Sequence, residues 1–348
     1  MLTGQVKLDQ LLKSTSRAFY LSLRILPKQV RKPISLAYLM ARAADTITDT
    51  ANISSATKIK SLDAIKCALT NDKTDLHFTW LPEDNTTHTL SELENQVIQA
   101  IPITLNSIQS LNSADYIHVK KVVLTLIQGM EMDLRYFSEP INESGVLSLA
   151  NAAELDLYTY LVAGCVGPFW TEISFANESK LKNTDVPLMS SLGIDFGKAL
   201  QMTNILRDCP SDIRLGKCYI SDEELNELQL SHSDLLNPAA AKEVRQLLAN
   251  QINKTLYLYQ SAERYVLSIP PTKVRLRLAV LWPLLLGLGT LNALVQKGTW
   301  VQSDSVVKVS RFWVYRMMLK SLFFVTSDYL IKFWIKQLRG SITQHLKT

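Results

Sequence analysis

The chain has 348 residues, of which 47% are hydrophobic and 20% are charged, and its formal net charge is +5. This charge is too small and too scattered for a nucleic-acid-binding protein, and it suits an anionic small substrate or an anionic membrane surface. Only 12 glycines and 12 prolines are present, which favours long helices over many short strands and predicts an all-α fold.

The predicted helices follow one another along most of the chain, because apolar residues recur at steps of three and four. The first long helix is predicted after Pro33, with that proline as an early helical residue. Further helices are predicted over 119–137, 155–173, 187–208, 239–266 and 274–295, and loops over 81–92, 138–151, 174–186 and about 298–306. No internal repeat or flexible linker interrupts this pattern, so a single all-α domain is the simplest expectation.

Two segments are unusually apolar. Residues 276–295 are nearly long enough to span a bilayer, but Pro283, Gly287 and Gly289 interrupt them, and we favour a helix buried in a large bundle. Residues 319–339 mix Phe, Trp and Leu with Lys and Arg. That composition fits either a helix lying in a membrane interface or a terminal helix docked on the core, and both interpretations are open.

The cysteines and histidines do not predict a zinc site. Four cysteines and five histidines are present without a CxxC pair or a cluster. Unpaired cysteines of this kind fit reduced thiols and a cytoplasmic protein. The first 13 residues lack the apolar segment of a signal peptide, so we expect no secretory signal there.

A first acidic motif reads RAADTITD over 42–49. On a helix, Tyr38, Arg42, Asp45 and Asp49 are spaced four, three and four apart and share one face. Two carboxylates one turn apart repel each other by a few tenths of a kcal/mol in an exposed helix. A bound cation between them would remove that cost.

A second motif, within NILRDCPSDIRLGKCY over 204–219, has the same character. Gln201, Asn204, Asp208 and Asp212 share a helical face and offer only oxygen donors, which suit magnesium or manganese. One DxxxD pair alone usually marks a solvated helix face. Two such faces in otherwise apolar helices favour a metal–diphosphate site, with Arg42 and Arg207 binding phosphate oxygens.

Four blocks of the sequence, taken together, resemble the squalene/phytoene synthase family. They are TSRAF (15–19), YLMARAADTITD (38–49), YTYLVAGCVG (158–167) and QMTNILRDCPSDIRLGKCY (201–219), and weaker similarity continues to about residue 318. The resemblance implies a single large helical bundle of the isoprenoid synthase type, with the acidic motifs facing across a central cavity. It also implies a magnesium-dependent prenyltransferase that joins two prenyl diphosphates.

The resemblance assigns roles to individual residues. The implied metal ligands, for magnesium or manganese, are Asp45, Asp49, Asn204, Asp208 and Asp212. The four aspartates and Tyr158 are the implied catalytic residues. The implied substrate-binding residues are Ser16, Arg17, Phe19, Tyr38, Arg42, Gln201, Asn204 and Arg207. From the pattern alone, core packing is the favoured interpretation of Tyr158 and Phe19, and Gly164 and Gly167 fit the close approach of a prenyl chain or of another helix. The chain departs from the family pattern at Thr48, Ser211 and Lys217, and these changes leave the four aspartates intact.

The product is indicated by two further stretches. SVVKVSRFWVYRMM (305–318) and GMEMDLRYF (129–137) resemble squalene synthases. This implies that Lys308 and Arg311, with Arg17 and Arg42, bind NADPH, unless the first two are simply solvated. We therefore expect a squalene synthase acting on farnesyl diphosphate. The alternatives are a phytoene or dehydrosqualene synthase, which needs no reductant and can use a longer prenyl diphosphate, and a non-catalytic membrane-associated relative.

The expected organisation is a catalytic domain over 1–318 and an amphipathic tail over 319–348. The tail is expected to allow peripheral contact with the cytoplasmic face of a membrane. The sequence does not indicate the oligomeric state.

Overall fold

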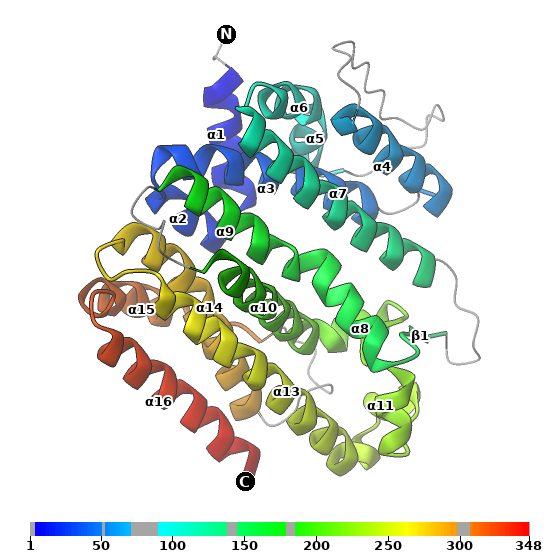
Figure 1. Ribbon diagram of the computed structural model, residues 1–348. Helices are drawn as coiled ribbons and strands as arrows, with labels where there is room; N and C mark the ends of the chain where they lie inside the picture. Colours follow the sequence, from blue (N-terminus) through cyan, green and yellow to red (C-terminus); the bar gives the residue numbers. More distant parts are fainter. Residues whose placement is uncertain are drawn as a thin grey trace. The chain divides into compact units, whose positions relative to one another are not determined.

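The computed structural model describes residues 4–50, 53–70, 90–137, 145–178, 185–297 and 307–347. The chain divides into two compact units. The first unit holds Met1–Ser138 and Phe169–Lys182, and the second holds Glu139–Pro168 and Asn183–Thr348. The described residues are almost entirely helical, with two strands of two residues each (Figure 1). The predicted all-α fold is therefore confirmed.

The first unit is organised around one long helix, α3 (Lys28–Asp49). Helices α4, α5, α6 and α7 all pack on α3, and α7 makes the most extensive contact. Its helices are α1 (Gly4–Thr15), α2 (Arg17–Ile25), α3, α4 (Ser55–Thr70), α5 (Glu92–Gln99), α6 (Ile101–Gln109), α7 (Ser113–Tyr136) and most of α9 (Val166–Asn177). Helix α9 is tied to α7, because His118 pairs with Glu172 at 2.8 Å.

Helix α3 begins earlier than the sequence pattern predicted. It starts at Lys28 with Pro27 at its N-cap, so Pro33 lies inside the helix rather than near its start. A proline at this position lacks the N–H that would bond four residues back. The helix tolerates that loss, because Val30, Ile34 and other apolar residues around Pro33 are buried in the core.

The second unit is organised around α10 (Val186–Arg214), which packs against α13, α14, α8 and the π-helical turn η1. Its elements are β1 (Leu147–Ser148), α8 (Ala152–Thr159), η1 (Tyr160–Gly164), α10, β2 (Lys217–Cys218), α11 (Asp222–Glu227), α12 (His232–Leu235), η3 (Pro238–Ala240), α13 (Ala241–Ser268), α14 (Val274–Lys297), α15 (Arg311–Phe324) and α16 (Asp328–Lys347). The parallel pair β1–β2 joins the segment before α8 to the segment after α10.

Three predicted helices differ from the structure in their extent. The helix predicted over 119–137 begins earlier, at Ser113. The helix predicted over 155–173 is divided into α8, η1 and α9, with Cys165 between the last two. The helix predicted over 187–208 continues through Pro210 to Arg214. Gly216, at φ +81°, ends this extension by donating its N–H to the carbonyl of Ile213.

Glycines allow α10 to approach its neighbours closely. A Cβ on Gly167 would lie 2.1 Å from the backbone carbon of Gly193, and a Cβ on Gly197 would lie 2.3 Å from the carbonyl oxygen of Ala163. Helix packing is therefore the role that the structure gives Gly167. On its other side, α10 is held by a 2.9 Å hydrogen bond between the hydroxyls of Thr203 and Tyr259.

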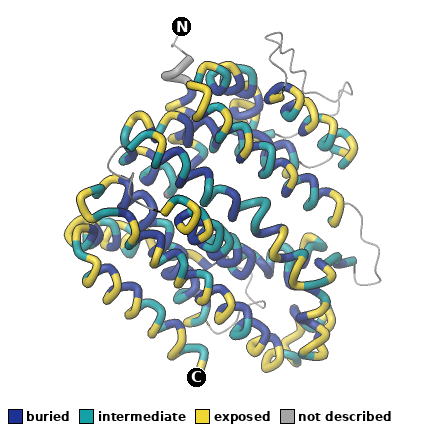
Figure 2. Tube along the Cα trace, viewed as in Figure 1, coloured by how far each residue is buried: buried dark blue, intermediate teal, exposed yellow. Residues whose placement is uncertain are grey.

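Helix α14 is the core helix that we favoured for the apolar segment 276–295. In the part of the chain that the structure describes, it alone is long and apolar enough to cross a membrane. Of its most apolar 18-residue window, 72% is buried inside the protein. Figure 2 colours the chain by burial, and along the helices buried residues alternate with exposed ones.

The predicted boundary between residues 318 and 319 falls inside α15. The division into a catalytic domain and a tail stays a prediction. Of the predicted loops, the parts over 81–89, 138–144, 179–184 and 298–306 lie outside the described residues. The loop predicted over 174–186 is wrong at its start, because α9 continues to Asn177.

Candidate active site

The first acidic motif lies on the C-terminal half of α3. Tyr38, Arg42 and Asp45 are half-buried and Asp49 is exposed. The residues between them, including Ala43, Ala44, Thr46 and Ile47, are buried. Solvent therefore reaches this part of α3 along the one face that carries the polar side chains.

Asp45 stands in an unusually negative environment. Its carboxylate accepts a 2.5 Å hydrogen bond from the guanidinium of Arg42. Burial and the neighbouring carboxylate of Asp49 nevertheless raise the pKa of Asp45 to about 6, because they outweigh Arg42. Asp133 of α7 adds to the effect. A cation held at this face would relieve the repulsion.

Asp133 is a residue that the sequence analysis did not select. It lies in the GMEMDLRYF stretch, where only the resemblance of the whole block was noted. Its proximity to Asp45 depends on the packing of α7 against α3, which connects residues far apart in the sequence. The only signal available was an acidic residue inside an apolar helix.

The aromatic residues of the first unit form a cluster beside α3. The rings of Phe19 and Tyr38 lie 5.4 Å apart, and that of Phe19 lies 6.5 Å from Trp170. The hydroxyl of Tyr38 donates to the carbonyl of Thr15 at 3.1 Å. Ser16 is buried and its hydroxyl donates to the carbonyl of Leu12 at 2.5 Å. Arg17 begins α2, and its side chain lies outside the described residues.

The second acidic motif lies on one face of α10. Gln201, Asn204, Asp208 and Asp212 are half-buried, while the rest of the helix around them is buried, as with Met202, Ile205, Leu206 and Cys209. The polar face thus repeats the arrangement found on α3. The extension of α10 to Arg214 is what keeps Asp212 in helical register with Asp208.

Arg207 and Asp208 form a bidentate pair. The Nε and Nη2 atoms of Arg207 donate to the two carboxylate oxygens of Asp208 at 2.8 and 2.5 Å. Hydrogen bonding to Asp208 raises the pKa of Arg207, so this arginine stays charged. Ser211, where the chain departs from the family pattern, donates its hydroxyl to the carbonyl of Asp208 at 2.7 Å. Its side chain therefore supports the local backbone.

Tyr158 is buried on α8 and stacks on Tyr219, with ring centroids 4.8 Å apart and an angle of 21°. Tyr219 follows β2, and the β1–β2 pair brings it next to α8. It ends the second acidic block, but the sequence analysis gave it no role. The π-helical turn η1 comes directly after α8, and such turns are frequent at functional sites.

Arg311 is the first residue of α15 and Lys308 lies just before the helix; both are exposed. They stand close in sequence to Ser310, whose hydroxyl caps the helix by accepting from the N–H of Trp313 at 3.1 Å. Exposed cationic side chains at this position can bind an anionic group or remain solvated, so the assignment of Lys308 and Arg311 to NADPH stays a prediction.

The two acidic faces belong to different units, α3 to the first and α10 to the second. Within the described residues, no three His, Cys, Asp or Glu side chains lie close enough to hold a metal ion on their own. The carboxylate and amide oxygens of each face are still the donor type that magnesium prefers.

Comparisons with known proteins point to one family. The family model described as squalene/phytoene synthase matches residues 12–313. A chloroplastic phytoene synthase from an Oncidium hybrid cultivar is 27% identical over 279 residues, which cover 80% of this chain and 57% of that protein. A bifunctional lycopene cyclase/phytoene synthase from Pyrenophora tritici-repentis is 26% identical, covering 74% and 41%. The chain thus spans about half the length of these curated relatives.

Solved structures share the fold over nearly the whole chain. A ligand complex of TcSQS has a TM-score of 0.75 at 17% identity, covering 98% of this chain and 97% of the other. A ligand-bound dehydrosqualene synthase has a TM-score of 0.65 at 17% identity, covering 93% and 98%. The squalene synthase HpnC from Alicyclobacillus acidocaldarius has a TM-score of 0.60 at 19% identity, covering 85% and 94%.

Proposed function

Because the chain belongs to the squalene/phytoene synthase family, whose members are prenyltransferases acting on prenyl diphosphates, we propose that it joins two prenyl diphosphates head to head. The observation that carries the proposal is the repeated polar face. Helices α3 and α10 each present, on the face that solvent reaches, two carboxylates four residues apart and an arginine hydrogen-bonded to one of them.

The donor set of these faces fits magnesium. Asp45 and Asp49 on one helix, and Asn204, Asp208 and Asp212 on the other, would hold the ions together with the diphosphates. The raised pKa of Asp45 supports this assignment, since it marks negative charge that the protein alone does not neutralise. When bound, the ions would supply positive charge against which the diphosphate leaves.

Arg42 and Arg207 are proposed to bind the diphosphate oxygens. A guanidinium has five N–H donors, so an arginine that holds a carboxylate through one or two of them can also bind a phosphate oxygen. Because each arginine is already oriented by its carboxylate, little side-chain entropy is lost on substrate binding. Gln201, Ser16 and Arg17 are the further polar residues proposed to contact substrate.

The reaction proposed for these residues begins when the C–O bond of the first substrate breaks and its electron pair leaves with diphosphate. The double bond of the second substrate attacks the allylic cation, and loss of one proton closes a cyclopropane. Tyr158 is proposed to steer the removal of that proton. The rings of Phe19 and Tyr38 stabilise positive charge without reacting as nucleophiles. Water must be kept away from the reacting carbons during this step, because it would capture the cation as an alcohol.

The proposed product is squalene, made from two farnesyl diphosphates. Loss of the second diphosphate and rearrangement leave a cation that takes a hydride from NADPH. The resemblance of 129–137 and 305–318 to squalene synthases supports this version. A second candidate, in which the cation loses a proton to give phytoene or dehydrosqualene, is favoured by the names of the curated relatives. We also propose a cytoplasmic location, which the four free thiols support.

The test is product identification with purified protein, magnesium, and either farnesyl or geranylgeranyl diphosphate, with and without NADPH. Squalene formed only with NADPH is the expected result, and a polyene formed regardless of NADPH would establish the second candidate. Asp208→Asn should abolish either activity, while Glu243→Gln, an exposed carboxylate on α13, should not. No hydrocarbon from wild type with either substrate would refute the proposal.

A further inference from the structure

Helix α15 turns an apolar face outward. Phe312, Tyr315, Leu319, Leu322 and Phe323 are 75, 67, 59, 54 and 72% exposed. They recur at helical spacing, so they form one continuous stripe. Most surface helices of soluble proteins show the opposite pattern, with polar residues on the solvent side.

The outward stripe is not the result of a loosely held helix. The opposite face of α15 is anchored on α14, because the Nε1 atom of Trp282 donates to the hydroxyl of Ser321 at 2.8 Å. Met317 is buried, and the ring of Trp313 fills the space over Gly289, where a Cβ would lie 2.5 Å from it. The packing therefore determines which side of α15 faces solvent.

Helix α16 extends the apolar surface without losing its own core contacts. Ile331, Trp334 and Ile335 are buried, as expected of a terminal helix docked on the core. On its outer side, the rings of Tyr329 and Phe333, which are 74 and 47% exposed, stack at 6.5 Å with an angle of 13°. The two helices are linked by the edge contact of Phe324 with Trp334 at 5.5 Å.

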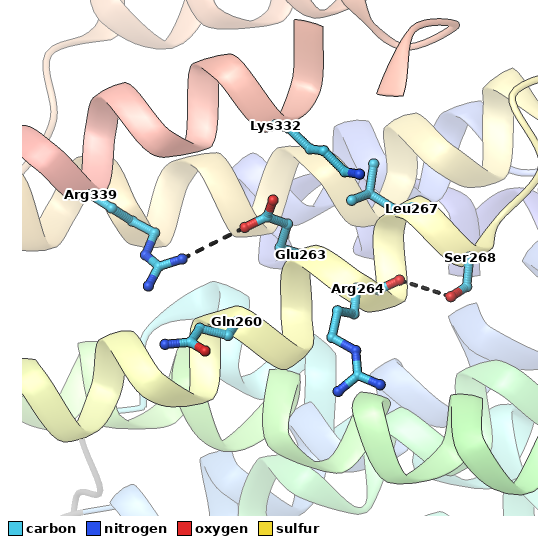
Figure 3. Close-up of a pocket in the computed structure, with 7 residues that line it drawn as sticks. All are labelled: Gln260, Glu263, Arg264, Leu267, Ser268, Lys332 and Arg339. Atoms are coloured by element: carbon cyan, nitrogen blue, oxygen red, sulfur yellow. Dashed lines mark hydrogen bonds and ion pairs between the residues drawn. The ribbon is translucent and has the colours of Figure 1, made fainter. Parts of the chain in front are cut away.

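Positive charge surrounds this surface. Residues 307–347 contain eight lysines and arginines and one acidic residue, Asp328, whereas the net charge of the whole chain is only +5. Asp328 is already paired with the buried Arg277. Arg264, Lys332 and Arg339 border a groove of about 460 Å³ between α13 and α16, beside Glu263 (Figure 3). Arg339 pairs with Glu263 at 3.7 Å. Cationic side chains thus lie both on the two helices that carry the apolar surface and at the groove beside α16.

We propose that this outer face of α15 and α16, together with its cationic border, docks on an anionic lipid bilayer. Aromatic side chains insert at the level of the headgroups, and each nearby lysine or arginine gains from the negative surface potential. The helices lie on the membrane and do not cross it, because α16 buries its apolar residues in the protein. The surface also begins at about residue 311, before the tail expected from the sequence.

The test is co-sedimentation of the full chain with vesicles, without substrate, so that its outcome is independent of the proposed reaction. Vesicles of equal parts phosphatidylglycerol and phosphatidylcholine should bind the protein at least tenfold more tightly than pure phosphatidylcholine, and higher salt should weaken the binding. Leu319→Ser with Phe323→Ser should reduce it at least tenfold. Ile117→Ser with Tyr257→Ser, which removes exposed apolar residues from α7 and α13, should leave it unchanged.

A second double variant tests the proposal independently, in case the first one fails to fold. Lys332→Gln with Lys336→Gln changes two exposed positions on α16 and should lower binding to the anionic vesicles about tenfold. Equal binding to both kinds of vesicle would overturn the proposal. Unchanged binding by both the Leu319→Ser, Phe323→Ser variant and the Lys332→Gln, Lys336→Gln variant would also overturn it. So would a dimer, detected by sedimentation velocity, that dissociates in the Leu319→Ser, Phe323→Ser variant, because the face would then join two copies of the chain.

Discussion

Gly197 provides the sharpest test of how α10 is positioned. A Cβ at this residue would lie 2.3 Å from the carbonyl oxygen of Ala163 and 2.8 Å from the Cα of Gly164. Both are backbone atoms of the π-helical turn that follows Tyr158. They cannot rotate away, so Gly197→Ala must push the two elements apart.

Two opposing contributions determine whether Gly197→Ala raises or lowers the free energy of unfolding. Alanine is favoured over glycine in a helix interior by about 1 kcal/mol. Overpacking in a well-packed core costs about 1 to 3 kcal/mol, and more where rigid backbone is the obstacle. Because the obstacle here is backbone, we expect Gly197→Ala to lower the free energy of unfolding by about 2 kcal/mol.

The assay is urea denaturation followed by circular dichroism, with Gly340→Ala as the matched control. Gly340 lies inside α16, and nothing would come within 4 Å of its Cβ. The control should therefore be stabilised by about 0.5 to 1 kcal/mol. The activity of Gly197→Ala should also fall, since the displacement separates the face of α10 from Tyr158. A Gly197→Ala protein as stable as wild type would refute the close approach.

Three further outcomes are expected. Because the pKa of Asp45 is raised to about 6, metal-free protein should lose stability as pH rises from 4 to 7; Asp45→Asn should remove this loss and raise the melting temperature at pH 8. An unchanged melting temperature of Asp45→Asn at pH 8 would contradict the raised pKa of Asp45. Burial opposes ionisation of Glu224, but hydrogen bonds from Lys254 and Gln251 lower its pKa. Wild type should therefore lose more stability than Glu224→Gln between pH 5 and 3 in thermal melts, and parallel curves would exclude this role. Asp328→Asn leaves the buried Arg277 without its charge partner. It should lower the free energy of unfolding in urea by about 3 kcal/mol, the lower end for a buried pair, because Asp328 is half exposed; an unchanged free energy of unfolding would refute this contribution.

Features that depend on local spacing could be predicted from the sequence. A period of 3.6 residues is enough to place Arg42, Asp45 and Asp49 on one face of a helix, and the same holds for Asp208 and Asp212. The all-α class followed from the apolar spacing and the low glycine and proline content. The composition of 319–339 also suggested contact with a membrane, but it could not say which side of a helix faces out.

Contacts between residues far apart in the chain could not be predicted and became visible only in the folded protein. The carboxylate of Asp133 influences Asp45 because α7 packs on α3, and Tyr219 stacks on Tyr158 because β1 pairs with β2. The outward face of α15 is set in the same way, by the hydrogen bond between Trp282 and Ser321. Such contacts leave no periodic trace in the sequence, because each joins segments separated by dozens of residues whose approach is determined by packing of the whole core.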